Sequence, residues 1–318
     1  MNQAAGPSQA PGLARLRSVL RVVLGGASIV FVAYAIYELA NRWESGKVSL
    51  HWGFVALSVL PLLLGVTVLG VGWKWLLERM TARPVPTLPA LALHVESQLA
   101  RYTPGKVGMP LVRMAGAPRL GASANVVGSS VLIELLPFLS VGGATGSLCL
   151  WLGSPHASGA LALIGRWGVV GLVAFAAITV ALIAVDRRHY PAFVLRALGV
   201  EGESPLIPRR VPLAHVAYWL TWALHGYFTN RAVGADHASS VAGAGLYVLA
   251  PIMGFLALVT PAGVGVREAV LSIGLAPVLS PPPAVAAAIV SRAASLVVDV
   301  VAGASGYLLN RRARRTSS

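Results

Sequence analysis

A series of apolar segments, each about 20 residues long, constrains this chain more than any other feature. A bilayer core is about 30 Å thick, so a helix needs roughly 20 apolar residues to span it. Seven segments are long enough: Val19–Leu39, Gly53–Leu77, Ala124–Leu152, Leu161–Val185, Leu213–Thr229, Ser239–Val259 and Ala284–Leu309. An eighth, Val264–Leu279, is shorter and predicts an incomplete or tilted crossing. We therefore expect an all-α, polytopic integral membrane helical bundle with about eight transmembrane helices, or six at the lower limit.

Composition supports lipid as the solvent of this chain. Of its 318 residues, 56% are hydrophobic and only 11% are charged, and the mean hydropathy is +0.73. A soluble domain carries about a quarter of its residues as charged side chains. The single cysteine, Cys149, lies inside an apolar segment and cannot form an intrachain disulfide.

Basic residues predict the orientation of the chain. The net charge is +14, and the cations lie mostly in the gaps between apolar segments. With the N-terminus in the cytoplasm, twenty basic residues fall on the cytoplasmic side and four on or near the other, a strong positive-inside signal. Both termini are then cytoplasmic and the number of crossings is even. It is eight if Val264–Leu279 crosses, and six if Ser239–Leu279 forms an embedded hairpin.

The chain divides into one membrane domain and short polar segments. Residues 1–12 are predicted to be a disordered cytoplasmic N-terminus, and residues 13–310 a single membrane-embedded domain. Within it, residues 186–212 form a basic cytoplasmic loop that is too short for a catalytic domain. Residues 311–318 form a basic tail suited to anionic lipid rather than to nucleic acid. No signal peptide is expected, because the first apolar segment is too long for one.

The first candidate motif is Arg101–Gly108, RYTPGKVG. Pro104 and Gly105 end a helix and permit a sharp reversal. The preceding segment, Leu88–Arg101, is too short to cross, so a re-entrant half-helix is favoured over an interfacial helix. Arg101, Lys106 and Arg113 gather cations around the break, and arginine can grip a phosphate with two parallel hydrogen bonds. The alternative is that these cations anchor a loop to lipid headgroups.

A second motif, Thr260–Glu268, matches the first. TPAGVG and TPGKVG agree at four of six positions, and both precede an arginine. Pro261, Gly263 and Gly265 break the helix, and Arg267 and Glu268 follow. Paired broken segments in two halves of a membrane protein are typical of transporter binding sites.

Ionisable residues inside the apolar segments are the third feature, because a charge at the bilayer centre costs about 3 kcal/mol and so needs a partner. They are Glu134, Arg292 and Asp299. One hypothesis pairs Glu134 with Arg292. Another makes Arg292 a headgroup ligand and Glu134 a proton or cation carrier. For Asp299 a structural role is favoured. No metal or cofactor motif is present, and His94, His215 and His225 are expected to be core or interface residues.

These motifs, in this order, resemble the lysylphosphatidylglycerol synthase transmembrane region, also called flippase-like membrane proteins. The resemblance rests on RYTPGKVG, on Arg113, Gly121 and Ser123, on the Glu134 segment and on PAGVGVREAVL, and it covers most of the chain. Its bifunctional members move aminoacylated phosphatidylglycerol between leaflets, while a separate cytosolic domain performs synthesis. That domain is expected to be absent, because nine residues follow Leu309. The resemblance implies a bacterial cytoplasmic membrane protein and carries over nine positions: Arg101, Pro104, Gly105, Lys106, Pro261, Gly263, Gly265, Arg267 and Glu268.

The leading functional prediction is translocation of a lipid. Arg101, Lys106, Arg113 and Arg267 would hold the phosphate of an anionic or aminoacylated phospholipid, or of a polyprenyl-phosphate lipid, in a midplane cavity between the two breaks. Glu134 and Arg292 would line or gate it. One alternative is an intramembrane transferase that uses Glu268 or Glu134 as a base. Another is a non-catalytic subunit of a lipid or glycan pathway. A homo-oligomer or a partner enzyme is compatible with each.

Overall fold

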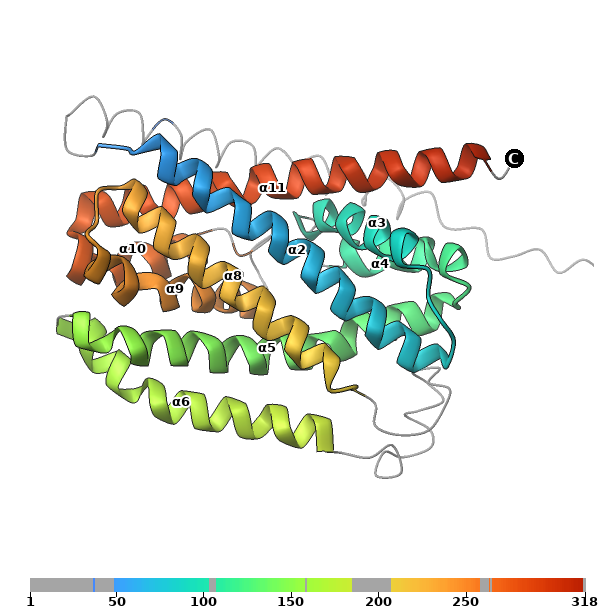
Figure 1. The fold of residues 1–318 in the computed structure, drawn as a ribbon, viewed down its shortest axis with the longest axis horizontal. Helices are drawn as coiled ribbons and strands as arrows, with labels where there is room; N and C mark the ends of the chain where they lie inside the picture. The colour runs from blue at the N-terminus through green and yellow to red at the C-terminus, as the bar shows by residue number, and fades with distance from the viewer. Residues whose placement is uncertain are drawn as a thin grey trace, which may run out of the picture.

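The structure is a computed structural model that describes residues 37, 49–102, 107–157, 159–184, 207–257, 263 and 265–316. In this part of the chain all regular structure is helical (Figure 1). The α-helices are α2 (Trp52–Thr81), α3 (Thr87–Gln98), α4 (Gly108–Ala115), α5 (Ala124–Gly153), α6 (Gly159–Ala184), α8 (Arg210–Ala232), α9 (His237–Leu256), α10 (Val266–Leu279) and α11 (Pro281–Thr316). Short 3-10 helices are η1 (Leu99–Tyr102), η3 (Ala117–Leu120) and η4 (Ser154–His156). The predicted fold class is confirmed.

Five described helical segments are long and apolar enough to cross a membrane: α2, α5 with η4, α6, α9 and α11. Helix α8 has 23 residues but is more polar, with buried His215, His225 and Asn230. The predicted spans agree with these helices to within a few residues, except at the C-terminal end of α11. The first predicted span, Val19–Leu39, lies almost wholly outside the described residues.

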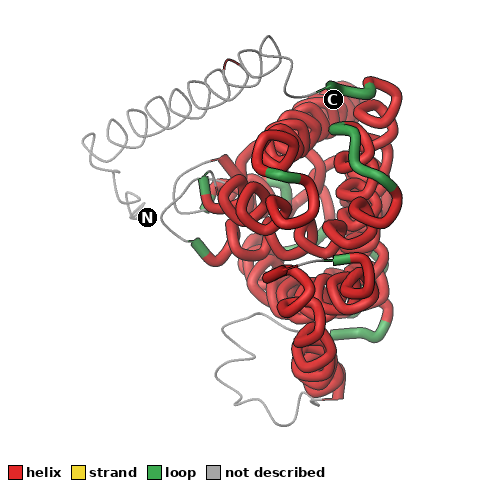
Figure 2. The backbone as a smooth tube through the Cα atoms, turned by 90° about the vertical axis from the view of Figure 1, so that its left-hand side faces the viewer, coloured by secondary structure: helices red, strands yellow, loops and turns green. Residues whose placement is uncertain are grey.

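Helices α2 and α8 run antiparallel and define the two ends of the bundle. At one end, the His51 amide donates to the Ala232 carbonyl at 2.8 Å. At the other, the Arg210 guanidinium lies 5.8 Å from the Trp75 ring centroid. These are named below the His51 end and the Arg210 end. Figure 2 views the bundle nearly along its long helices.

Helices α9 and α10 form a hairpin that enters from the His51 end and returns to it. Val233, just before α9, and Leu279, at the end of α10, pack in one cluster with Leu50 and Leu161. Asp236 caps α9 there: its carboxylate accepts the Ser239 amide at 2.7 Å, and this bond lowers the pKa of Asp236. The geometry thus corresponds to the predicted alternative of an embedded hairpin at residues 239–279 rather than two full crossings.

Helices α3 and α4 form a second hairpin, which enters from the Arg210 end. Val85 precedes α3 and Leu120 ends η3, and both pack in one cluster with Ile207 and Val211. From Ala90 to Gln98 no residue of α3 is exposed, and His94 is fully covered. This placement supports the half-helix interpretation over an interfacial helix. The two hairpins therefore enter the bundle from opposite ends.

Both hairpins pack against helix α11. Helix α10 packs along its first half, where Arg267 bonds Ser291. Helix α3 packs along its second half, where Asn310 donates to Glu96. With 12 and 14 residues, α3 and α10 rise about 18 and 21 Å, each more than half of a bilayer core. Laid end to end against α11, they complete one crossing with a break in the middle.

Candidate functional site

The tips of the two hairpins meet at the middle of α11. In the first tip, Pro104, Gly105 and Lys106 lie outside the described residues, as does Pro261 in the second. The residues on either side are described: η1 on the first hairpin, and Gly263, Gly265 and the start of α10 on the second. The site can therefore be followed from Arg101 to Arg267.

Two glycines shape the second tip. Gly263 and Gly265 have φ of 69° and 85°, a left-handed conformation that favours glycine. At Gly263 a Cβ would also lie 2.6 Å from the Gly254 Cα. The end of α9 can therefore pack this closely only because residue 263 has no side chain. The Gly265 amide donates to Glu268 Oε2 at 2.7 Å, which caps α10 with its own carboxylate. The other oxygen of Glu268, Oε1, lies 3.6 Å from Arg292 Nε.

The first tip is fixed to α11 through Asp299. Its Oδ2 accepts the Tyr102 hydroxyl at 2.7 Å and lies 3.4 Å from Arg101 Nη1. Arg101 Nη2 also donates to the Gln98 side chain. These contacts favour the structural role predicted for Asp299, and they hold Arg101 at the tip of its hairpin.

Arg267 projects from α10 into the interior, where its side chain is only 7% exposed. Its two terminal nitrogens donate to Ser291 Oγ at 2.9 Å and to Ser295 Oγ at 3.3 Å. Its guanidinium lies 4.6 Å from the Trp222 ring centroid, within cation–π range. Among the described residues no carboxylate forms an ion pair with it, so its buried charge is solvated by hydroxyls and an aromatic face.

A small cavity of about 20 Å³ lies beside Arg101 and Asp299, and Ser295, which Arg267 contacts, also lines it. It is apolar on the side of α2, aromatic on the side of α8, and polar towards the hairpin tip and α11. Its lining residues are Leu62, Val66 and Leu69; Tyr218 and Trp222; Gln98 and Arg101; and Ser295, Val298 and Asp299. A volume of this size holds about one water molecule, so a lipid headgroup requires the hairpins and α2 to separate.

Arg113 belongs to a second, separate buried cluster. Its Nη1 meets Glu134 Oε2 at 2.7 Å, its Nη2 meets His94 Nδ1 at 2.8 Å, and its Nε donates to Ser97 at 3.1 Å. It is 1% exposed and lies over the Trp73 ring. These contacts favour a structural ion pair that fastens α4 to α5. The predicted phosphate contact of Arg113 remains a prediction.

The hypothesis that Glu134 pairs with Arg292 is wrong. Glu134 pairs with Arg113, and Arg292 lies beside Glu268 on the neighbouring helix. The reason is topological. Helix α4 packs on α5 and places Arg113 beside Glu134, whereas α10 packs on α11 and places Glu268 beside Arg292.

Two uncharged polar residues beside the site, Ser291 and Ser295, were not predicted. With Asp299 they are spaced four apart along α11, a polar stripe in an otherwise apolar helix that could have revealed them. Tyr102 and Trp222 gave no comparable signal. His94, His215 and His225 are fully buried, as expected of core histidines. Within the described residues, no three His, Cys, Asp or Glu side chains gather as a metal site.

These features define a multi-pass helical membrane protein with two broken hairpins inserted from opposite ends. The chain belongs to the family described as the lysylphosphatidylglycerol synthase TM region, whose family model matches residues 18–303. Membership gives the protein a membrane lipid-related role. No curated protein matches the sequence.

Proposed function

We propose that this protein translocates a lipid across the membrane and that the two hairpin tips bind its phosphate. The observation that carries the proposal is the convergence of Arg101 and Arg267, from hairpins that enter at opposite ends, on one stretch of α11. Their respective partners there, Asp299 and Ser295, line one small amphipathic cavity. A site between oppositely inserted broken helices is accessible from either side by small movements of one hairpin.

Electrostatics favour an anionic group at this site. Arg101 is partly compensated by Asp299, whereas Arg267 has no ion-pair partner among the described carboxylates. Helix α10 also directs its N-terminal end into the middle of the bundle, and helix N-termini attract anions. A phosphate placed between Arg101 and Arg267 would neutralise a cation that is otherwise costly inside a membrane. Lys106 lies five residues after Arg101 and would add a third donor.

The cavity walls fit a molecule with a polar head and apolar tails. The polar surface lies at the hairpin tips, and the apolar surface of Leu62, Val66 and Leu69 continues along α2. Phospholipids and polyprenyl-phosphate lipids share this chemistry. On the predicted orientation, the Arg210 end faces the cytoplasm and the His51 end the opposite side.

Lipid transfer in proteoliposomes tests the proposal. Arg267→Ala and Lys106→Ala are each expected to slow transfer of labelled phosphatidylglycerol about 10- to 100-fold, because a charge-assisted hydrogen bond contributes about 1.5–3 kcal/mol. Arg166→Ala is the matched control: it removes an exposed arginine from α6 and should transfer lipid like the parent protein. Size-exclusion profiles establish that each variant is folded.

Polyprenyl phosphate, used as a second labelled lipid, distinguishes the cargo classes. If folded Arg267→Ala and Lys106→Ala proteins transfer both lipids at the parent rate, the proposed site is refuted.

A further inference from the structure

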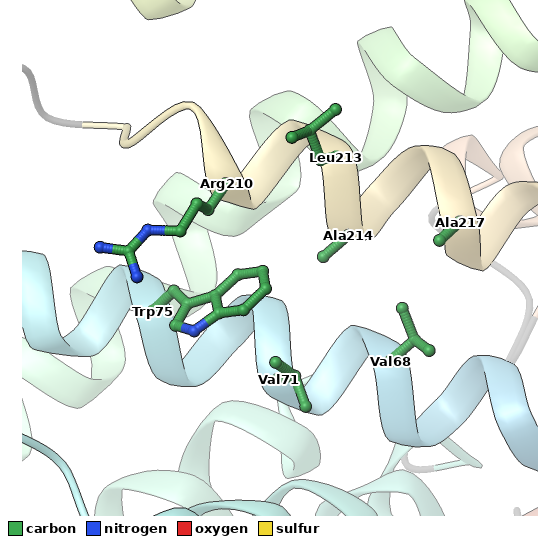
Figure 3. Close-up of a pocket in the computed structure, with 7 residues that line it drawn as sticks. All are labelled: Val68, Val71, Trp75, Arg210, Leu213, Ala214 and Ala217. Carbon is green, nitrogen blue, oxygen red and sulfur yellow. The ribbon is translucent and has the colours of Figure 1, made fainter.

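A groove lies on the outer side of the α2–α8 pair. Its volume is about 310 Å³, at the lower end of the range for small-molecule sites. Helix α2 contributes one wall and α8 the other (Figure 3). The lining residues are Val68, Val71 and Trp75 on α2, and Arg210, Leu213, Ala214 and Ala217 on α8.

The groove exists because the two helices approach closely on one side only. A Cβ at Gly72 would lie 2.8 Å from that of Ala214, so small residues bring the backbones together there. Beside this contact, Ala217 and Val68 are too short to fill the space towards the outside. The remaining channel is lined by carbon and open along its length.

One end of the groove is cationic and aromatic. Arg210 extends from α8 towards α2, and its guanidinium lies 5.8 Å from the Trp75 ring centroid (Figure 3). Arg210 is exposed and forms no ion pair with a described carboxylate. The first turn of α8 holds no acidic residue, so the positive end of the helix dipole adds to the charge. Tryptophan beside arginine is typical of the headgroup level of a membrane.

We propose that this groove binds a single anionic phospholipid, with one acyl chain between α2 and α8 and its phosphate on Arg210. The apolar channel matches the tail and the single cation at its mouth matches the charge of the headgroup. This site is distinct from the interior cavity, which lies on the other side of the same helix pair and is lined by Leu62, Val66, Tyr218 and Trp222. It does not depend on the proposed translocation.

A photoreactive lipid tests the groove directly. The full-length protein is placed in vesicles that contain phosphatidylglycerol with a diazirine in its acyl chain, and the labelled peptides are identified by mass spectrometry. Labelling is expected within residues 68–75 and 210–217. Excess unlabelled phosphatidylglycerol should compete about fivefold better than phosphatidylcholine, because one arginine near the surface contributes about 1 kcal/mol towards an anionic lipid.

Two pairs of variants separate headgroup from tail. Arg210→Gln should abolish the preference for phosphatidylglycerol, whereas Arg209→Gln, which removes the adjacent exposed arginine that does not line the groove, should retain it. Ala217→Phe fills the channel and should reduce labelling at least fivefold. Ala177→Phe makes the same change at an exposed position of α6 and should not.

Three outcomes overturn the proposal. They are equal competition by the two lipids, equal effects of Arg209→Gln and Arg210→Gln, and labelling that never falls on the groove in any variant. The last is the result expected if the predicted span at residues 19–39 covers this face instead.

Discussion

Arg113 and Arg267 are both buried but differ in what surrounds them. Arg113 meets a carboxylate, an imidazole and a hydroxyl, so its charge is neutralised inside the protein. Arg267 meets two serine hydroxyls and an indole, so its charge is solvated but not neutralised. The first arrangement stabilises a fixed structure, while the second is the one on which the proposed phosphate site depends.

Removal of the acid that pairs with Arg113 should destabilise the protein strongly. In Glu134→Gln the guanidinium keeps its burial but loses its counter-charge, and a broken buried ion pair costs about 3–5 kcal/mol. Thermal unfolding in detergent measures the effect. The double variant Glu134→Gln with Arg113→Gln should be more stable than Glu134→Gln alone, because no uncompensated charge remains.

The comparison for that experiment is Glu78→Gln. Glu78 pairs with Lys74 at a partly exposed position on α2, and such pairs contribute about 1 kcal/mol or less. Equal unfolding temperatures of Glu134→Gln and Glu78→Gln would mean that the Arg113–Glu134 pair is not buried away from water.

The sequence predicted the charged residues of the site but not their partners. Arg101 and Arg267 were found because each adjoins a proline–glycine break, a local signal. The Glu134–Arg113 pair depends on where α4 lies against α5, and no local pattern encodes that contact. Ser291 and Ser295 were missed although they form a polar stripe with Asp299, because a serine in an apolar helix usually bonds its own backbone.

At the level of elements, the length of each apolar segment predicted which helices are too short to cross the membrane, but it did not predict which longer helices turn back inside the bundle. Helix α10 has 14 residues and α3 has 12, so neither could be a complete crossing. Helix α9 has 20 residues and is long enough to cross, yet it turns inside the bundle. Its direction is decided by Gly254 against Gly263, where α9 and the start of α10 come into backbone contact. A hydropathy profile does not contain that contact.

The turn between α9 and α10 can be tested with two alanines. Gly263→Ala suffers both a left-handed backbone and a collision with Gly254, while Gly265→Ala suffers only the backbone conformation, because nothing lies within 4 Å of its added Cβ. A left-handed alanine costs about 1–2 kcal/mol. We expect Gly263→Ala to lower the unfolding temperature more than Gly265→Ala and to impair lipid transfer, since Arg267 follows four residues later.

The result that contradicts this account is a Gly263→Ala protein as stable as Gly265→Ala. The two chain segments would then not be in contact at Gly254, and the hairpin tip would be open.

For the whole molecule, the two hairpins and the distribution of basic residues indicate the same membrane topology. Five described elements run from end to end (α2, α5, α6, α8 and α11), and each hairpin returns to the end from which it came. The predicted span at residues 19–39 would make six crossings, an even number that puts both termini on one side. Arg83, Arg209 and Arg210 lie exposed at the Arg210 end, which the positive-inside rule assigns to the cytoplasm.

This topology is tested by labelling single cysteines from outside the cell. In a Cys149→Ala background, Asn2→Cys and Ser318→Cys report on the termini, and His156→Cys reports on the exposed turn at the His51 end. A membrane-impermeant maleimide should label only His156→Cys in intact cells and all three after permeabilisation. Labelling of one terminus but not the other would require an odd number of crossings, because each full span moves the chain to the opposite side and a returning hairpin does not. Labelling of both termini with His156→Cys protected would reverse the orientation. The Arg210 groove and the α3–α4 hairpin would then face the outer leaflet, where the surface potential that attracts basic residues is weaker.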